Sequence, residues 1–151
     1  MMKIKILSLL LIAAACTAKV SIERPITGTW KLVSGTLIEK GDTITTDYTK
    51  NLSFIKVIND THFSFLLHDI DGGRDSTTAT YSSGGGKYDL AGNKYTEHLE
   101  YCSDRQWEGH DFSFTVTING DTLVQQGVEE VESAGVNRLN IEKYVRLKAN
   151  P

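Results

Sequence analysis

Apolar and polar residues alternate with a period of two along much of this chain, which is typical of β-strands with one buried face. In the segment 111–118, four large apolar residues (Phe112, Phe114, Val116 and Ile118) fall on the same side. Related patterns predict further strands at 28–38, 52–58, 61–68, 77–82, 87–90, 94–102, 121–127 and 137–147.

Almost no segment has the period of a helix, and Thr, Val, Ile, Tyr and Phe are common between the two prolines, so we expect an all-β domain. Residues 43–50 are polar and remain ambiguous. The acidic segment 128–135 fits either a loop or one helical turn. The glycine-rich segment 82–86 is either a mobile loop or a glycine bend within a strand.

Short turns join the predicted strands. The strongest turn signal is Asn119-Gly120, because both positions tolerate the positive φ of a type I′ hairpin. Turns this short can join only neighbouring antiparallel strands, and a meander loses its exposed edges when it closes. We therefore predict a single antiparallel up-and-down β-barrel of about eight or nine strands, whose interior holds side chains or one small ligand.

The first fifteen residues form a separate segment. Lys3 and Lys5 precede the apolar run 6–12, and the small residues 13–15 lead to Cys16. A positive start, a short apolar run and small residues are typical of a secretory signal peptide. The run is shorter than the roughly 20 apolar residues that span a bilayer. We expect the signal peptide to be residues 1–15.

The small residues directly before Cys16 resemble a bacterial lipobox. This resemblance implies that Cys16 is acylated and becomes the first residue of the mature protein, anchored to a membrane through its lipid. The alternative is an ordinary signal peptide cut nearby, with Cys16 removed or incidental. With acylation, residues 16–26 form a tether and 27–149 form the barrel domain. The expected location is the cell envelope, at the outer membrane, with the periplasmic and the surface-facing side both open.

The length of 151 residues suits one domain. Removing residues 1–15, which carry two lysines and no acid, changes the formal net charge from −3 to −5. The chain has no long basic run, so we do not expect nucleic acid or an anionic lipid surface as a partner. If Cys16 is acylated, Cys102 has no cysteine to pair with, and stability must come from the core.

Three stretches resemble the lipocalin or calycin group, and more closely the lipocalin-like domain of small bacterial lipoproteins of unknown function. They are GTWKL at 28–32, YTEHLEY at 95–101 and IEKYVRL at 141–147, which together bracket nearly all of the mature chain. The C-terminal helix and the further loop motifs of full-length lipocalins are absent from the sequence. The resemblance is therefore closer to the calycins in general than to the lipocalins proper.

The resemblance also implies roles at the closed end of the barrel. In this group a tryptophan of the first strand sits at that end, and an arginine of the last strand packs across it. Trp30, with Gly28 in the same motif, and Arg146 match these positions. A guanidinium over an indole contributes about 0.5–2 kcal/mol, depending on desolvation.

Candidate ligand contacts come from the predicted inner faces. Within 94–102, the face with Tyr95, Glu97, Leu99 and Tyr101 is the more apolar one, so we expect it to point inward. A carboxylate there needs partners or becomes protonated. Glu97 is either a ligand anchor or part of an internal network with residues such as Arg146. The candidate ligand-binding residues are Tyr88, Tyr95, Glu97, Tyr101 and Tyr144, and plain core lining is the alternative for Tyr144.

No constellation of catalytic or metal-binding residues stands out. The four histidines lack the spacing of a zinc site, and the aspartates around Gly72 and Gly73 lack the spacing of a calcium loop. No serine stands in a nucleophile-elbow pattern, and Cys102 is expected to be an unreactive, partly buried residue. We therefore predict no metal, no cofactor and no enzymatic activity.

Two functions remain open. The first is a membrane-anchored lipocalin-like lipoprotein that binds a small apolar or amphipathic molecule in the barrel. The second is a non-enzymatic interaction or structural module whose loops bind a protein or glycan partner at the cell envelope, for example through an exposed Trp107 in the loop 103–110. An interior cavity of about 300 Å³ or more with a mouth favours the first, and a barrel filled with aromatic side chains favours the second.

Overall fold

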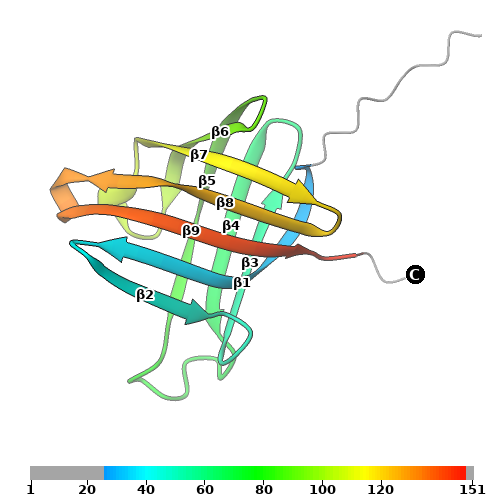
Figure 1. Ribbon diagram of the computed structural model, residues 1–151. Helices are drawn as coiled ribbons and strands as arrows, with labels where there is room; N and C mark the ends of the chain where they lie inside the picture. Colours follow the sequence, from blue (N-terminus) through cyan, green and yellow to red (C-terminus); the bar gives the residue numbers. More distant parts are fainter. Residues whose placement is uncertain (1–25, 149–151) are drawn as a thin grey trace, which may run out of the picture.

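The computed structural model describes residues 26–148, which form nine strands and two short 3-10 helices (Figure 1). No helix in this part of the chain is long and apolar enough to cross a membrane. In chain order the elements are β1 (Gly28–Glu39), β2 (Asp42–Asp47), β3 (Leu52–Ile58), β4 (His62–Asp69), β5 (Tyr81–Ala91), β6 (Lys94–Cys102), η1 (Arg105–Trp107), β7 (His110–Asn119), β8 (Thr122–Val131), η2 (Glu132–Ala134) and β9 (Val136–Arg146).

The strands form a closed antiparallel barrel. From β3 to β9 each strand pairs with the next in sequence, and β1 closes the ring by pairing with both β3 and β9. Strand β2 is an addition to the eight-stranded ring, because it pairs only with β1 at 34–39, beyond the part of β1 at 28–31 that pairs with β3. The predicted all-β fold, a single closed antiparallel up-and-down barrel, is confirmed.

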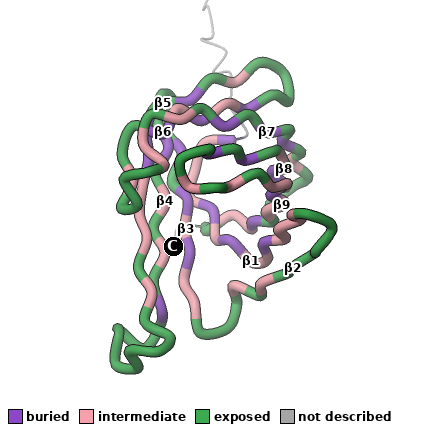
Figure 2. Tube along the Cα trace, turned by 90° about the vertical axis from the view of Figure 1, so that its left-hand side faces the viewer, coloured by how far each residue is buried: buried purple, intermediate pink, exposed green. Residues whose placement is uncertain are grey.

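The alternation in the sequence reappears as alternating burial along the strands. On β7, Phe112, Phe114 and Val116 are buried, while the residues between them are exposed. Figure 2 shows that buried positions lie on the strands and that the turns are mostly exposed. Strand β2 is exposed along nearly its whole length, as expected for a strand outside the closed ring.

The glycine-rich segment lies inside a strand. The strand predicted at 87–90 is confirmed but begins earlier, because one continuous strand, β5, runs from Tyr81 to Ala91; the separate strand predicted at 77–82 was wrong. The alternative of a glycine bend within a strand is confirmed. A side chain at Gly86 would collide with the carbonyl of His98, and one at Gly84 would come within 2.7 Å of the Phe65 ring. These glycines permit close packing of β5 against its neighbours.

A β-bulge beside these glycines reverses the facing of the end of β6. The register changes between Gly85, which pairs with Tyr101, and Gly86, which pairs with Leu99. A bulge adds one residue to one strand, so the side chains beyond it change sides. The prediction that Tyr101 points inward was therefore wrong, as it is 67% exposed on the outer wall. Cys102, beyond the same bulge, is half-buried and packs against the core.

Trp30 and Arg146 lie together at one end of the barrel, on neighbouring strands. Trp30 is fully buried, and the guanidinium carbon of Arg146 lies 4.0 Å from the centre of its ring. The indole Nε1 donates to the Ile26 carbonyl at 2.8 Å, and Arg146 Nη1 donates to the Thr27 carbonyl at 2.7 Å. Gly28 has a positive φ of 137°, and a Cβ there would lie 2.6 Å from Arg146 Nη1. Arg146 therefore ties the last strand to the segment that leads into the first.

Replacing Arg146 by Met should keep the aliphatic bulk but remove both the contact of the guanidinium with Trp30 and the hydrogen bond to Thr27. We expect a loss of about 1–3 kcal/mol in the free energy of unfolding, measured by urea denaturation. The matched control is Arg74→Met, because the Arg74 side chain is 83% exposed. Equal losses in the two variants would contradict the role given to Arg146.

Candidate functional site

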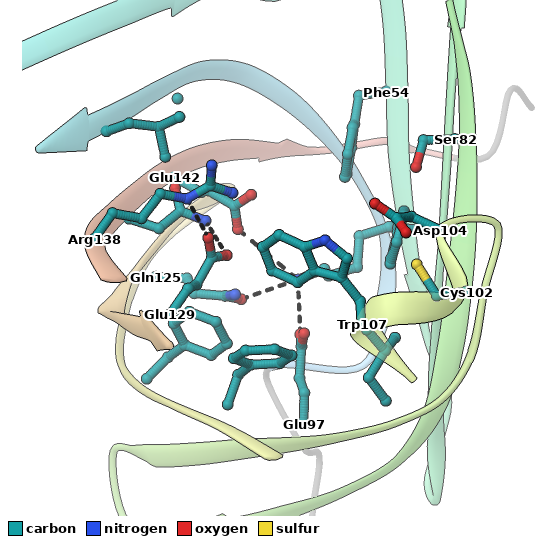
Figure 3. Close-up of a pocket in the computed structure, with 18 of the residues that line it drawn as sticks. Phe54, Ser82, Glu97, Cys102, Asp104, Trp107, Gln125, Glu129, Arg138 and Glu142 are labelled. Carbon is teal, nitrogen blue, oxygen red and sulfur yellow. Dashed lines mark hydrogen bonds and ion pairs between the residues drawn. The ribbon is translucent and has the colours of Figure 1, made fainter. Parts of the chain in front are cut away.

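A cavity of about 340 Å³ lies inside the barrel, on the side away from Trp30. It is lined from all strands of the ring, from β2 and from the loop that contains η1 (Figure 3). It reaches the surface beside Asp104, which is an exposed residue. Its aromatic lining residues are Tyr48, Phe54, Phe65, Trp107, Phe112 and Phe114, and its charged or amide lining residues are Lys56, Glu97, Asp104, Gln125, Glu129, Arg138, Asn140 and Glu142.

Lys56 is the centre of a buried polar cluster. Its ammonium donates to Glu97 Oε1 at 2.7 Å and to Gln125 Oε1 at 3.2 Å, and it lies 4.0 Å from Glu142 Oε2. It also lies 5.3 Å from the centre of the Tyr144 ring. The four polar side chains come from β3, β6, β8 and β9, so the cluster exists only because the sheet closes.

Electrostatics keep the Lys56 ammonium charged. Burial alone would lower the pKa of Lys56, but the charges of Glu97 and Glu142 and the hydrogen bond to Glu97 raise it above its ordinary value. Burial raises the pKa of Glu97, and the charge of Lys56 acts against that shift. Each member of the pair therefore compensates the burial of the other.

A second ion pair lies nearer the mouth of the cavity. Glu129 accepts hydrogen bonds from Arg138 Nε at 2.8 Å and from Asn140 Nδ2 at 2.7 Å. Burial raises the pKa of Glu129, and the charge of Arg138 opposes this. The guanidinium carbon of Arg138 also lies 5.3 Å from the centre of the Trp107 ring. This pair thus connects the polar wall of the cavity to its aromatic rim.

Of the five predicted ligand-binding residues, Glu97 alone lines the cavity. Tyr95 and Tyr144 are fully buried, and Tyr88 is nearly so. The Tyr144 hydroxyl donates to Glu142 Oε2 at 2.8 Å, and the Tyr88 hydroxyl donates to the Asn59 carbonyl at 2.7 Å. The three tyrosines are therefore core residues beneath the cavity, while Tyr101, as described above, lies outside the barrel.

The Tyr95 hydroxyl is buried and makes no hydrogen bond within residues 26–148 that meets standard distance and angle limits. Its ring packs on that of Tyr88, with the two centres 5.2 Å apart. Burial raises the pKa of Tyr95, and the negative charge of Glu97 adds to the shift, so the hydroxyl stays protonated. Tyr95 is thus available as a donor at the deep side of Glu97.

Sequence reasoning missed Lys56, which is the partner of Glu97. The sequence suggested Arg146 for that role, but Arg146 lies at the closed end of the barrel, over Trp30. The signal was present, because Lys56 occupies the inward position between Phe54 and Ile58 in the alternation of β3. A lysine normally indicates that its face of the strand is exposed to solvent. Only the closed ring shows that the Lys56 side chain meets carboxylates inside the barrel.

Trp107 was expected to be exposed in a loop, and this was wrong. It is half-buried, it lines the cavity, and its ring centre lies 5.7 Å from that of Phe112. The short helix η1 that carries it begins with an N-cap, since the Asp104 side chain accepts from the Gln106 amide. The chief feature that favoured a partner-binding loop therefore belongs to the cavity instead.

Breaking the buried pair should be costly. Lys56→Met leaves Glu97 buried without its cation, and Glu97→Gln leaves Lys56 without its carboxylate, so each variant should lose about 3–5 kcal/mol of unfolding free energy. The double variant should lose clearly less than the sum of the two, since neither charge is then left alone. Urea denaturation of the four proteins measures this. Lys148→Met, which breaks an exposed pair with Asp121, serves as the control with an expected loss of about 1 kcal/mol or less. Additive losses at Lys56 and Glu97 would contradict the coupling.

Comparisons with known proteins found similarity in solved structures alone, since no family model and no curated protein matches the sequence. A mutant of the fluorescent protein UnaG has 12% identity and a TM-score of 0.39, over 83% of this chain and 98% of that one. BcnA of Burkholderia cenocepacia has 15% identity and a TM-score of 0.40, over 79% of this chain and 96% of that one. Because these values are low, the function proposed below rests on the geometry of the cavity.

Proposed function

We propose that this protein is a lipid-anchored lipocalin-like protein of the bacterial cell envelope that binds a small apolar or amphipathic molecule inside its barrel. The observation that carries the proposal is the cavity of about 340 Å³, which the aromatic side chains leave unfilled. Sites for small molecules enclose roughly 300–1,000 Å³, so this cavity suits a ligand at the small end of that range.

The walls of the cavity provide the affinity. Phe54 and Phe65 stack with their ring centres 5.8 Å apart, and Leu99, Phe112 and Phe114 add further apolar surface. Each Å² of apolar surface that the ligand and these side chains remove from water contributes roughly 25 cal/mol to the free energy of binding. The body of the ligand would therefore lie against these residues.

The polar cluster at the inner side of the cavity would orient the ligand. Lys56, Glu97 and Gln125 are held by their mutual hydrogen bonds, so they offer fixed charges and dipoles that need no rearrangement on binding. A few fixed polar groups in an otherwise apolar site are typical of ligand pockets. An amphipathic molecule would place its polar end here and its apolar end towards Trp107 and the mouth.

The proposal predicts a bound small molecule in protein purified from its own host. Native mass spectrometry should show an extra mass that disappears under denaturing conditions. Leu37→Trp, which adds bulk to the cavity wall, should reduce the occupied fraction at least several-fold. Leu66→Trp, a matched change on the outer wall, should leave it unchanged. A host-purified protein with no bound molecule would overturn ligand binding.

The proposed anchor is a lipid on Cys16, which lies outside the described residues. Cys16→Ser should remove the mass of the acyl chains from the intact protein and move the protein from the membrane fraction to the supernatant of host cells. The reason is that several acyl chains together hold a protein firmly at a membrane. An unchanged mass and an unchanged membrane fraction would refute lipidation.

A further inference from the structure

Among the polar groups that the hydrogen bonds within the cavity leave open, two belong to residues that pair directly across neighbouring strands, Gln125 and Glu142. Most of the polar cluster is satisfied internally: Lys56 is surrounded by Glu97, Gln125 and Glu142, and each carboxylate oxygen of Glu129 accepts one hydrogen bond. Groups already paired in this way contribute little to the selection of a ligand. The unused capacity therefore shows which chemistry the cavity recognises.

The first available group is one oxygen of Glu142. Its Oε2 accepts from the Tyr144 hydroxyl at 2.8 Å, whereas its Oε1 accepts no hydrogen bond from any described residue. The side chain lines the cavity and is 15% exposed. A carboxylate oxygen in this position lacks a donor, and a ligand in the cavity can supply one.

The second available group is the amide of Gln125, which is 2% exposed and lines the cavity. Its orientation is fixed, because the Lys56 ammonium can only donate and must face the amide oxygen. The NH₂ group then has no acceptor among residues 26–148. Gln125 and Glu142 are direct partners across β8 and β9, so an open donor and an open acceptor belong to the same part of the cavity wall.

The charge of the cavity selects between kinds of ligand. Away from the exposed Asp104 at the mouth, three carboxylates (Glu97, Glu129 and Glu142) face two cations (Lys56 and Arg138), which leaves one negative charge in excess in the inner part of the cavity. An anionic ligand would add a second uncompensated charge in a poorly solvated space, and this is costly. A ligand with one positive charge would neutralise this excess and would form a charge-assisted hydrogen bond with a carboxylate of the cavity.

Resting on the proposed function, we infer that the ligand is a small organic amine, whose protonated nitrogen donates to Glu142 Oε1. The Gln125 amide, beside it, receives an acceptor atom of the same molecule. The apolar body of the amine extends along Phe54 and Phe65 towards Trp107, whose ring faces the cavity. The site thus selects its ligand by charge at the inner end and by apolar contact along the wall.

Calorimetric titration with three probes of one shape tests this inference: phenylbutylamine, phenylbutanol and phenylbutyrate, at neutral pH. The protein is the full chain carrying Cys16→Ser, so that neither lipid nor detergent competes. We expect the amine to bind with a Kd at least about tenfold below that of the alcohol, as a charge-assisted hydrogen bond implies, and the acid to bind most weakly. Leu37→Trp should weaken all three, which would place binding in the cavity.

Glu142→Gln should weaken binding of the amine about tenfold or more and change binding of the alcohol less than about twofold. The control is Glu100→Gln, an exposed position on β6 that should leave binding of the amine unchanged. If Glu142→Gln does not fold, the order of the three dissociation constants, measured on the protein without this substitution, still tests the amine inference. Equal or tighter binding of the alcohol or the acid would overturn the amine inference and leave ligand binding intact. Binding of none of the three would also overturn it, while the native mass spectrometry decides ligand binding separately.

Discussion

The contact between Arg146 and Trp30 is the interaction on which the rest of the structure depends. It joins the last strand to the first, and the hydrogen bonds to Ile26 and Thr27 fix the approach to β1 as well. The cavity is lined by residues other than this pair. The inward residues of β3 to β9 can be ordered by their distance from the closed end of the barrel, from the core around Trp30 to the mouth of the cavity.

The polar cluster around Lys56 is not what a barrel of this size needs for stability alone. A buried ion pair seldom stabilises a fold more than apolar residues of equal volume, because the desolvation of both charges offsets their attraction. Glu97, Gln125 and Glu142 nevertheless converge on one ammonium, in the part of the barrel that borders the empty space. Their convergence gives the inner end of the cavity a set of fixed charges and dipoles, which the proposed ligand would meet.

Much of the barrel could be predicted from the sequence, and the site could not. Period-two alternation and the Asn119-Gly120 turn indicated antiparallel neighbours, since both are local signals. The predicted inward orientation of Tyr101 was wrong because a bulge beside Gly85 reverses the alternation along β6. No local sequence pattern indicated this bulge. Lys56 was missed because its partners lie on three other strands. Its place in the alternation of β3 indicates that it points inward, but not which side chains it meets there.

Strand β1 shares one of its edges between two partners, β3 along its first residues and β2 along its last. Beyond that division the wall next to the cavity is continuous through side chains such as Tyr48 and Phe54, whose ring centres lie 5.9 Å apart, rather than through a backbone ladder. Separating β2 from β3 along this boundary would break a few van der Waals contacts, whereas separating any two paired strands of the ring would break a row of backbone hydrogen bonds. The β1–β2 hairpin remains joined to the ring on its other side, where β1 pairs with β9 from Trp30 to Ile38.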